Sequence, residues 1–218
     1  MLSSAIQEYL KTIFKLHTGR PVSTTRIAKE LKISGASVTG MLKRLSSLNL
    51  VVYNSYKGVV LSKLGLETTL NIIRRHRLIE AFLKEVLHYD LSKIHSEAAA
   101  IDYSVSDYFI HRIDLLMGHP KYSPFGKPIP SSELIMPVEK VELLSDVEPG
   151  RKIIIRRLDD SNNEMVDYLE KKGFTPGTIV EVQKKEPFLG PITLYINGQL
   201  DFIGYEMAKR LFVEEILT

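Results

Sequence analysis

Histidine and carboxylate side chains recur at helical spacing in the middle of the sequence. His76 and Glu80 are four residues apart, His95 and Asp102 are seven apart, and Glu97 lies between the last two. Residues at these spacings share one face of a helix. Two imidazoles and several carboxylates from adjacent helices could form an open nitrogen and oxygen site for a divalent iron, manganese, cobalt or nickel ion. A lone His–Glu pair at this spacing is more often a surface ion pair than a set of metal ligands, so the spacing alone favours the ion pair.

The composition excludes several kinds of metal and catalytic site. None of the 218 residues is Cys, which excludes disulfides, thiolate zinc sites, iron–sulfur clusters and cysteine nucleophiles. No HExxH motif and no phosphate-cradling glycine loop accompanies the histidines. A metal-dependent hydrolase is therefore a poor alternative, and we expect neither an enzyme nor a small-molecule substrate.

Long helices must position these residues. Apolar residues at steps of three and four predict a helix from Ser62 to about Leu87, and one helix or a pair from His95 to about Met117. Both segments are apolar on more than one face, which favours self-association, so we expect a homodimer. No uncharged apolar run reaches the length of a membrane span, and we expect a cytoplasmic protein without a membrane partner.

The first part of the chain predicts a winged helix-turn-helix. A first helix ends near Thr18, and a second, capped by Ser23 or Thr24, is separated from a third by a break at Lys32–Gly35. Residues 51–53 and 59–61 are predicted to pair as the two strands of a wing.

Charge and side-chain size around the third helix indicate a DNA-binding surface. Residues 1–75 hold 12 Lys and Arg against 3 Asp and Glu, a formal charge of +9, whereas the 17 basic and 23 acidic residues that follow give −6. Small polar residues near the start of a recognition helix, with cations around them, suit the major groove and its phosphates. The other interpretation is a capped, solvated helical hairpin. The predicted DNA contacts are Thr24, Thr25, Arg26, Ser34, Ala36, Ser37, Thr39, Gly40, Lys43, Arg44 and Lys57.

A proline-rich boundary separates the helices from a predicted β domain. Five of the ten prolines lie between Gly118 and Pro137. Beyond them, strands are predicted over residues 152–158, 179–183, 192–196 and 211–216, with a helix over 163–172 and a hairpin turn at Asn197–Gly198. We therefore predict a mainly α fold with a small β domain: a winged helix-turn-helix over 1–64, a helical metal-binding and dimerisation domain over 65–137, and an SH3-like barrel over 138–218.

Several motifs, taken in this order, resemble the iron-dependent repressor family typified by diphtheria toxin repressor and its manganese-responsive relatives. The resemblance covers residues 4 to about 130 and rests on EYLKTI, VSTTRIAKELKISGASVTGMLKRL, RRHRLIEAFL, IHSEA and SPFGKPIP. The segment from Val147 to Ile216 is similar in pattern to the SH3-like third domain of the iron-responsive branch and to FeoA-type domains. The resemblance implies a dimeric, metal-dependent repressor that binds palindromic operator DNA and controls metal-uptake genes, with Fe²⁺ as the first expected ion and Mn²⁺ as the second.

The resemblance also implies two metal sites. The family's ancillary site falls on three residues that can all coordinate, His76, Glu80 and His95, and the third domain contributes near Asp160 and Glu164. The primary site would use Glu8 from the first helix and three positions that are Ala99, Asp102 and Tyr103 here. This second site is either degraded or rebuilt from Glu8, Asp102, Glu97 and water. The alternative function is a constitutive or otherwise regulated winged-helix DNA-binding protein with a relic metal site.

Overall fold

The computed structural model describes residues 2–216. Within this range the chain forms two compact units. One consists of the chain up to Arg74 together with Pro130–Ile135, and the other consists of the remainder. Among the described residues, no helix combines the length and the apolar character needed to cross a bilayer.

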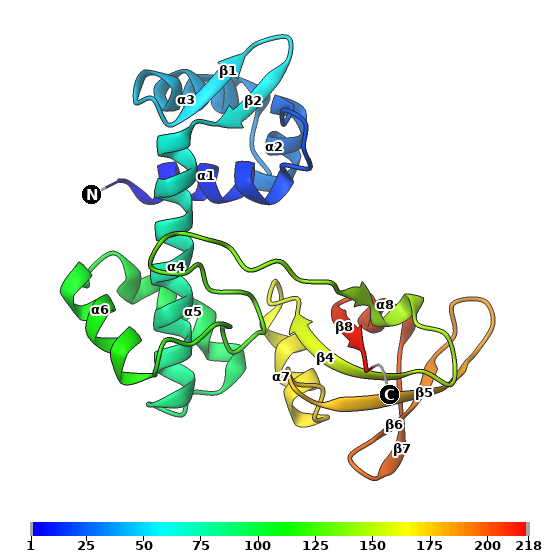
Figure 1. Ribbon diagram of the computed structural model, residues 1–218. Helices are drawn as coiled ribbons and strands as arrows, with labels where there is room; N and C mark the ends of the chain where they lie inside the picture. The colour runs from blue at the N-terminus through cyan, green and yellow to red at the C-terminus, as the bar shows by residue number, and fades with distance from the viewer. Residues whose placement is uncertain (1, 217–218) are drawn as a thin grey trace. The chain divides into compact units, whose positions relative to one another are not determined.

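The first unit contains a winged helix-turn-helix, as predicted (Figure 1). Its elements are α1 Ser4–Leu16, α2 Thr24–Leu31, α3 Gly35–Ser47, β1 Val51–Asn54 and β2 Gly58–Leu61. Their apolar faces meet in one core that includes the fully buried side chains of Leu10, Ile13, Ile27, Val38 and Leu42. Burial of these faces is the main force that holds three short helices and a hairpin together.

Local hydrogen bonds set where these short helices begin. The Ser23 hydroxyl accepts a hydrogen bond from the backbone N–H of Arg26, and the Ser34 hydroxyl accepts one from Ser37. Each bond satisfies an N–H that the first helical turn cannot pair internally. Between the two helices, Lys32 adopts a left-handed conformation with φ 55°, which ends α2 and directs the chain into α3.

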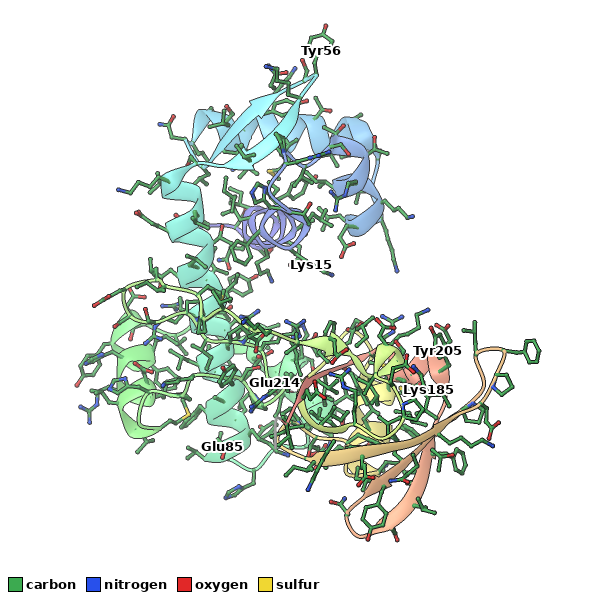
Figure 2. The ribbon with its side chains drawn as sticks, turned by 45° about the vertical axis from the view of Figure 1, so that its right-hand side comes forward. Lys15, Tyr56, Glu85, Lys185, Tyr205 and Glu214 are labelled. Atoms are coloured by element: carbon green, nitrogen blue, oxygen red, sulfur yellow. The ribbon has the colours of Figure 1, made fainter. Side chains whose placement is uncertain are left out.

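The wing is a tight antiparallel hairpin. Val51 pairs with Leu61 at one end and Asn54 with Gly58 at the other. The Asn54 side chain accepts hydrogen bonds from the backbone N–H groups of Tyr56 and Lys57, at 2.9 and 3.0 Å. Tyr56, which is 98% exposed, lies at the tip and points away from the strands (Figure 2). This turn therefore presents Tyr56 and Lys57 to solvent on a fixed backbone.

The helices of the second unit continue from α4. This helix spans Lys63–Glu85, so its residues after Arg74 belong to the second unit, and it is followed by α5 Leu91–Asp102 and α6 Asp107–Leu116 (Figure 1). The segment predicted from His95 as one helix or a pair is a pair of helices, and the first of them begins four residues earlier than predicted. Apolar residues of α4, α5 and α6 join one core, which includes Leu78, Leu83, Ile94, Ala98 and Ile113.

The second unit also contains a six-stranded antiparallel sheet in the order β3-β8-β4-β5-β6-β7. The turn at Asn197–Gly198 has positive φ at both residues, as expected for a two-residue hairpin. The predicted class, mainly helical with a small β domain, is confirmed. The elements of this part are β3 Glu142–Leu143, η1 Leu144–Asp146, β4 Lys152–Leu158, α7 Asn163–Lys171, β5 Ile179–Lys185, β6 Ile192–Ile196, β7 Gln199–Ile203, α8 Tyr205–Ala208 and β8 Leu211–Glu215.

Candidate metal centre

Two helices bring His76, Glu80 and His95 together. His76 and Glu80 lie one turn apart on α4, and His95 lies on α5. The Glu80 oxygen Oε1 is 3.1 Å from His76 Nε2 and 3.1 Å from His95 Nδ1, and the two nitrogens are 3.3 Å apart. In the described part of the chain, this is the only group of three histidine, cysteine or carboxylate residues close enough to share an ion.

The spacing of these donor atoms suits a transition metal. Bonds of about 2.1 Å at right angles place neighbouring donors about 3.0 Å apart, so the separations of the three atoms are already close to the edge lengths of a coordination polyhedron. Glu80 is only 1% exposed, and its second oxygen, Oε2, is buried without a hydrogen-bond partner among the described residues. A buried carboxylate oxygen without a partner is costly, and a cation would satisfy it. His95 is half exposed, which leaves the site open to solvent.

The electrostatics of the site follow from this burial and pairing. Burial alone would lower the pKa of His76, but hydrogen bonds with Asp102 and Glu80 outweigh it and raise that pKa to about 9. Burial alone would raise the pKa of Glu80, but hydrogen bonds from His76 and His95 hold it well below its usual value. Without a metal, the imidazolium of His76 therefore supplies the positive charge beside Glu80.

The two predicted ligands from the β domain differ in their surroundings. Asp160 lies 3.9 Å from His95 Nδ1, and both of its oxygens accept hydrogen bonds from the ammonium group of Lys127 at 2.5 Å. Glu164 is an exposed residue in the first turn of α7. Asp160 thus joins the edge of the cluster, and Lys127 holds its carboxylate.

The predicted residues of a second site belong to different units of the chain. Asp102 is buried at the end of α5, where it contacts His76 and Arg75, whereas Glu8 belongs to the other unit and forms an ion pair with Lys11 at 3.0 Å. Glu97 is exposed on α5. The participation of Glu8 and Asp102 in metal binding stays a prediction.

The sequence did not single out Lys127 and Arg75, although both contact acidic residues of the cluster. Their partners lie 33 and 27 residues away along the chain, at Asp160 and Asp102. No spacing rule connects positions so distant. The only signals in the sequence were the types of the two residues: Lys127 is a basic residue inside SPFGKPIP, and Arg75 is the arginine directly before His76.

The predicted DNA contacts lie on the surface of the first unit. Thr24 and Thr39 are half-buried and the others are exposed, on the start of α2, along α3 and in the wing loop. The Thr39 hydroxyl donates a hydrogen bond to the Gly35 carbonyl at 2.9 Å, so it is partly engaged within the helix. A Cβ added at Gly40 would meet no other described atom within 4 Å, so this position offers a flat surface to an approaching molecule.

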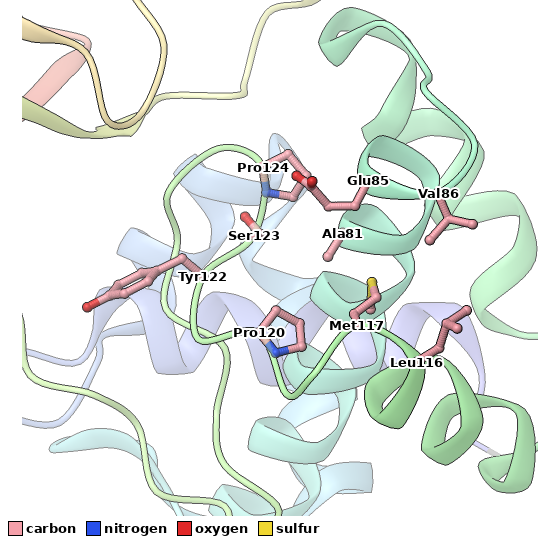
Figure 3. A pocket seen from close by; sticks show the side chains of 9 residues that line it. All are labelled: Ala81, Glu85, Val86, Leu116, Met117, Pro120, Tyr122, Ser123 and Pro124. Atoms are coloured by element: carbon pink, nitrogen blue, oxygen red, sulfur yellow. The ribbon is translucent and has the colours of Figure 1, made fainter.

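A separate pocket of about 410 Å³ lies beside the last turns of α4 (Figure 3). Its lining contains no histidine and a single carboxylate, so it lacks the donor set of His76, Glu80 and His95. The lining residues are Ala81, Glu85, Val86, Leu116, Met117, Pro120, Tyr122, Ser123 and Pro124.

Comparison with known families divides the chain into three matched segments. Residues 1–59 match the domain described as iron dependent repressor, N-terminal DNA binding domain. Residues 62–131 match the iron dependent repressor, metal binding and dimerisation domain, and residues 143–215 match the FeoA domain. The cluster of His76, Glu80 and His95 lies entirely within the second segment.

Individual relatives agree with these matches. The chain is 34% identical over 118 residues to an uncharacterised HTH-type transcriptional regulator of Methanocaldococcus jannaschii, covering 53% of this chain and 94% of that protein. It is 27% identical over 227 residues to the diphtheria toxin repressor of Corynebacterium diphtheriae, covering 99% of each. Among solved structures, a manganese-dependent transcriptional repressor in complex with manganese has a TM-score of 0.85 at 28% identity, covering 97% of this chain and all of that one.

Proposed function

Because this chain belongs to the iron-dependent repressor family and has the family's DNA-binding and metal-binding domains, we propose that it is a metal-activated transcriptional repressor. It acts in the cytoplasm, where as a homodimer it binds palindromic operator DNA and controls metal-uptake genes. It has no enzymatic activity. The observation that carries the proposal is a buried Glu80 oxygen that has no partner among the described residues, beside two histidine nitrogens at coordination spacing.

The activating ion is held by His76, Glu80 and His95, with Asp160 and Glu164 as further ligands. The donors are nitrogen and oxygen only, which suits Fe²⁺ first and Mn²⁺ second. When bound, the ion supplies positive charge to Glu80 and a link between α4 and α5. Glu80 brings one negative charge and the two imidazoles bind in their neutral form, so His76 gives up its proton.

The DNA surface consists of the contacts predicted on α2, α3 and the wing. Two such surfaces in a symmetric dimer enter successive major grooves about 34 Å apart. The helix α4 runs without interruption from the first unit to the metal ligands, so it is the direct covalent connection between the two functions. Coupling of about 1 to 3 kcal/mol between metal and DNA is expected, and it is reciprocal, so DNA tightens metal binding by the same factor.

The domain assignment belongs to this proposal. Residues 1–64 bind DNA, 65–137 bind metal and form the dimer, and 138–218 form the SH3-like domain. The matched family segments over 1–59, 62–131 and 143–215 support this division.

The test is substitution of one ligand with a matched control. His76→Ala should lower Mn²⁺ affinity and Mn²⁺-stimulated DNA binding together, and it should leave metal-free DNA binding nearly unchanged. His111→Ala, at an exposed histidine on α6, should change neither. Equilibrium dialysis and fluorescence anisotropy on labelled duplexes measure the two quantities. A His76→Ala protein that keeps the full metal response would refute the site.

A further inference from the structure

Asp102 lies next to the imidazole ring of His76, on the side away from Glu80 and His95. Its carboxylate is buried at the last residue of α5, with Oδ2 3.5 Å from His76 Nδ1 and Oδ1 3.8 Å from Arg75 Nε. The other ring nitrogen of His76, Nε2, faces Glu80 and His95. Asp102 therefore contacts the side of the imidazole ring that points away from the other two donors.

Arg75 forms an ion pair with this carboxylate. Its side chain is 15% exposed, and the guanidinium donates hydrogen bonds to the backbone carbonyls of Val105 and Asp102, at 2.8 and 3.4 Å. It also pairs with Asp107 in the first turn of α6. The last carbonyls of α5 have no helical partners of their own, and a cation there satisfies them. Arg75 is thus anchored at the junction of α5 and α6 by contacts on both sides.

These contacts leave little room for a second cation at Asp102. The guanidinium is a permanent positive charge within 3.8 Å of the carboxylate, and it repels any metal ion that approaches. The neighbouring positions Ala99 and Tyr103 supply neither a carboxylate nor an imidazole. A carboxylate that hydrogen-bonds to the outer nitrogen of a metal-binding histidine has a different use, because it selects the tautomer and the ring orientation.

On the premise of the proposed function, we propose that Asp102 and Arg75 are a positioning pair that orients His76 toward Glu80, so that each protomer binds one activating ion and not two. The Nδ1–H group of His76 donates to Asp102, and Nε2 keeps its lone pair for the metal. Arg75 holds the Asp102 carboxylate at the correct place by its bonds to the α5–α6 junction. This role replaces the one predicted from the sequence for Asp102, that of a metal ligand: neither Asp102 nor Arg75 touches the ion.

The first test counts the ions bound by the wild-type chain. Equilibrium dialysis against Mn²⁺ followed by elemental analysis should give one ion per chain at saturation. Because this measurement uses the unaltered protein, it does not depend on whether any variant folds. Two ions per chain, with loss of one in Asp102→Asn and unchanged affinity of the other, would overturn the inference and leave the proposed function intact. No bound ion in the wild type would instead overturn both.

The second test separates positioning from general structural support. Asp102→Asn should weaken Mn²⁺ binding about 10- to 100-fold, as is typical when such a partner is removed, and should leave the saturating number of ions at one. In the Zn²⁺-loaded protein, nitrogen NMR of His76 should show coordination through Nε2 in the wild type and a mixture of ring orientations in the variant. Asp90→Asn, at an exposed carboxylate just before α5, is the control and should preserve the wild-type spectrum. An unchanged His76 spectrum and affinity in a folded Asp102→Asn protein would refute the positioning role.

Discussion

Raising the pH should destabilise the metal-free protein, because His76 then loses its proton. The pKa of His76 rises from 6.5 to about 9 on folding, because its hydrogen bonds to Asp102 and Glu80 outweigh the cost of burial. At pH below 6.5 the folded and unfolded chains both carry this proton, and the stabilisation is fully present. Between pH 6.5 and 9 only the folded chain keeps it, so stability falls with each step of pH and the contribution is lost above 9.

The size of this loss follows from the pKa difference. A difference of one pKa unit is worth about 1.4 kcal/mol, so the free energy of unfolding should fall by about 3 kcal/mol between pH 6.5 and pH 9. The His76 side chain is 13% exposed, so solvent screening takes little from this figure. A loss of this size is a large part of the stability of an ordinary domain, at about 5 to 15 kcal/mol.

Urea denaturation of the metal-free protein, in chelator at pH 6.5 and 9, measures the loss. His76→Gln should remove about 3 kcal/mol of the difference between the two pH values, by the same pKa relation. Saturating Mn²⁺ should flatten the wild-type profile as well, since the bound imidazole carries no proton in this range. A wild-type profile identical to that of His76→Gln would refute the ion pair between His76 and Glu80.

Three further predictions concern the two binding surfaces. Gly40→Ala should stabilise the protein by about 0.5 to 1 kcal/mol, because the new Cβ meets open space, yet it should weaken DNA binding. Thermal unfolding measures the stability and fluorescence anisotropy measures the DNA affinity. An undiminished DNA affinity would show that Gly40 lies outside the interface. Arg44→Ala should weaken binding to all duplexes and reduce the slope of log affinity against log salt by about 1, whereas a changed base preference would contradict a phosphate contact. Mn²⁺ affinity should rise up to about tenfold per pH unit between pH 6.5 and 9, because His76 releases one proton when the ion binds. Calorimetry in buffers of different ionisation enthalpy counts the protons released. A count of zero would exclude His76 as their source.

The elements with long regular patterns were predictable from the sequence. The strand β4 has the predicted bounds, Lys152–Leu158, because its run of three β-branched isoleucines is typical of a strand. The strand β3 has two residues and the helix α8 has four, too few to establish a period. β3 exists because Glu142 and Leu143 pair with Val213 and Phe212, some 70 residues later in the chain. Such pairing is a property of the folded chain and leaves no local trace.

The candidate metal centre was predictable only in part, for a similar reason. His76 and Glu80 share a helical face by spacing alone, but the approach of His95 depends on how α5 packs against α4. The contacts of Arg75 with Asp102 and of Lys127 with Asp160 could not be derived, since each joins two helices or a loop and a strand end. Sequence therefore identified donors and missed the cations that hold two of the carboxylates.

The most direct test of the central claim is selection of duplexes from a random DNA pool, performed anaerobically with Fe²⁺ and again with chelator. Enrichment of a palindromic sequence with Fe²⁺ alone is the predicted result, because metal and DNA binding are coupled. Recovery of the same sequence in chelator, at equal yield, would contradict metal activation and leave a constitutive DNA-binding protein. Recovery of no sequence under either condition would contradict the DNA-binding function itself.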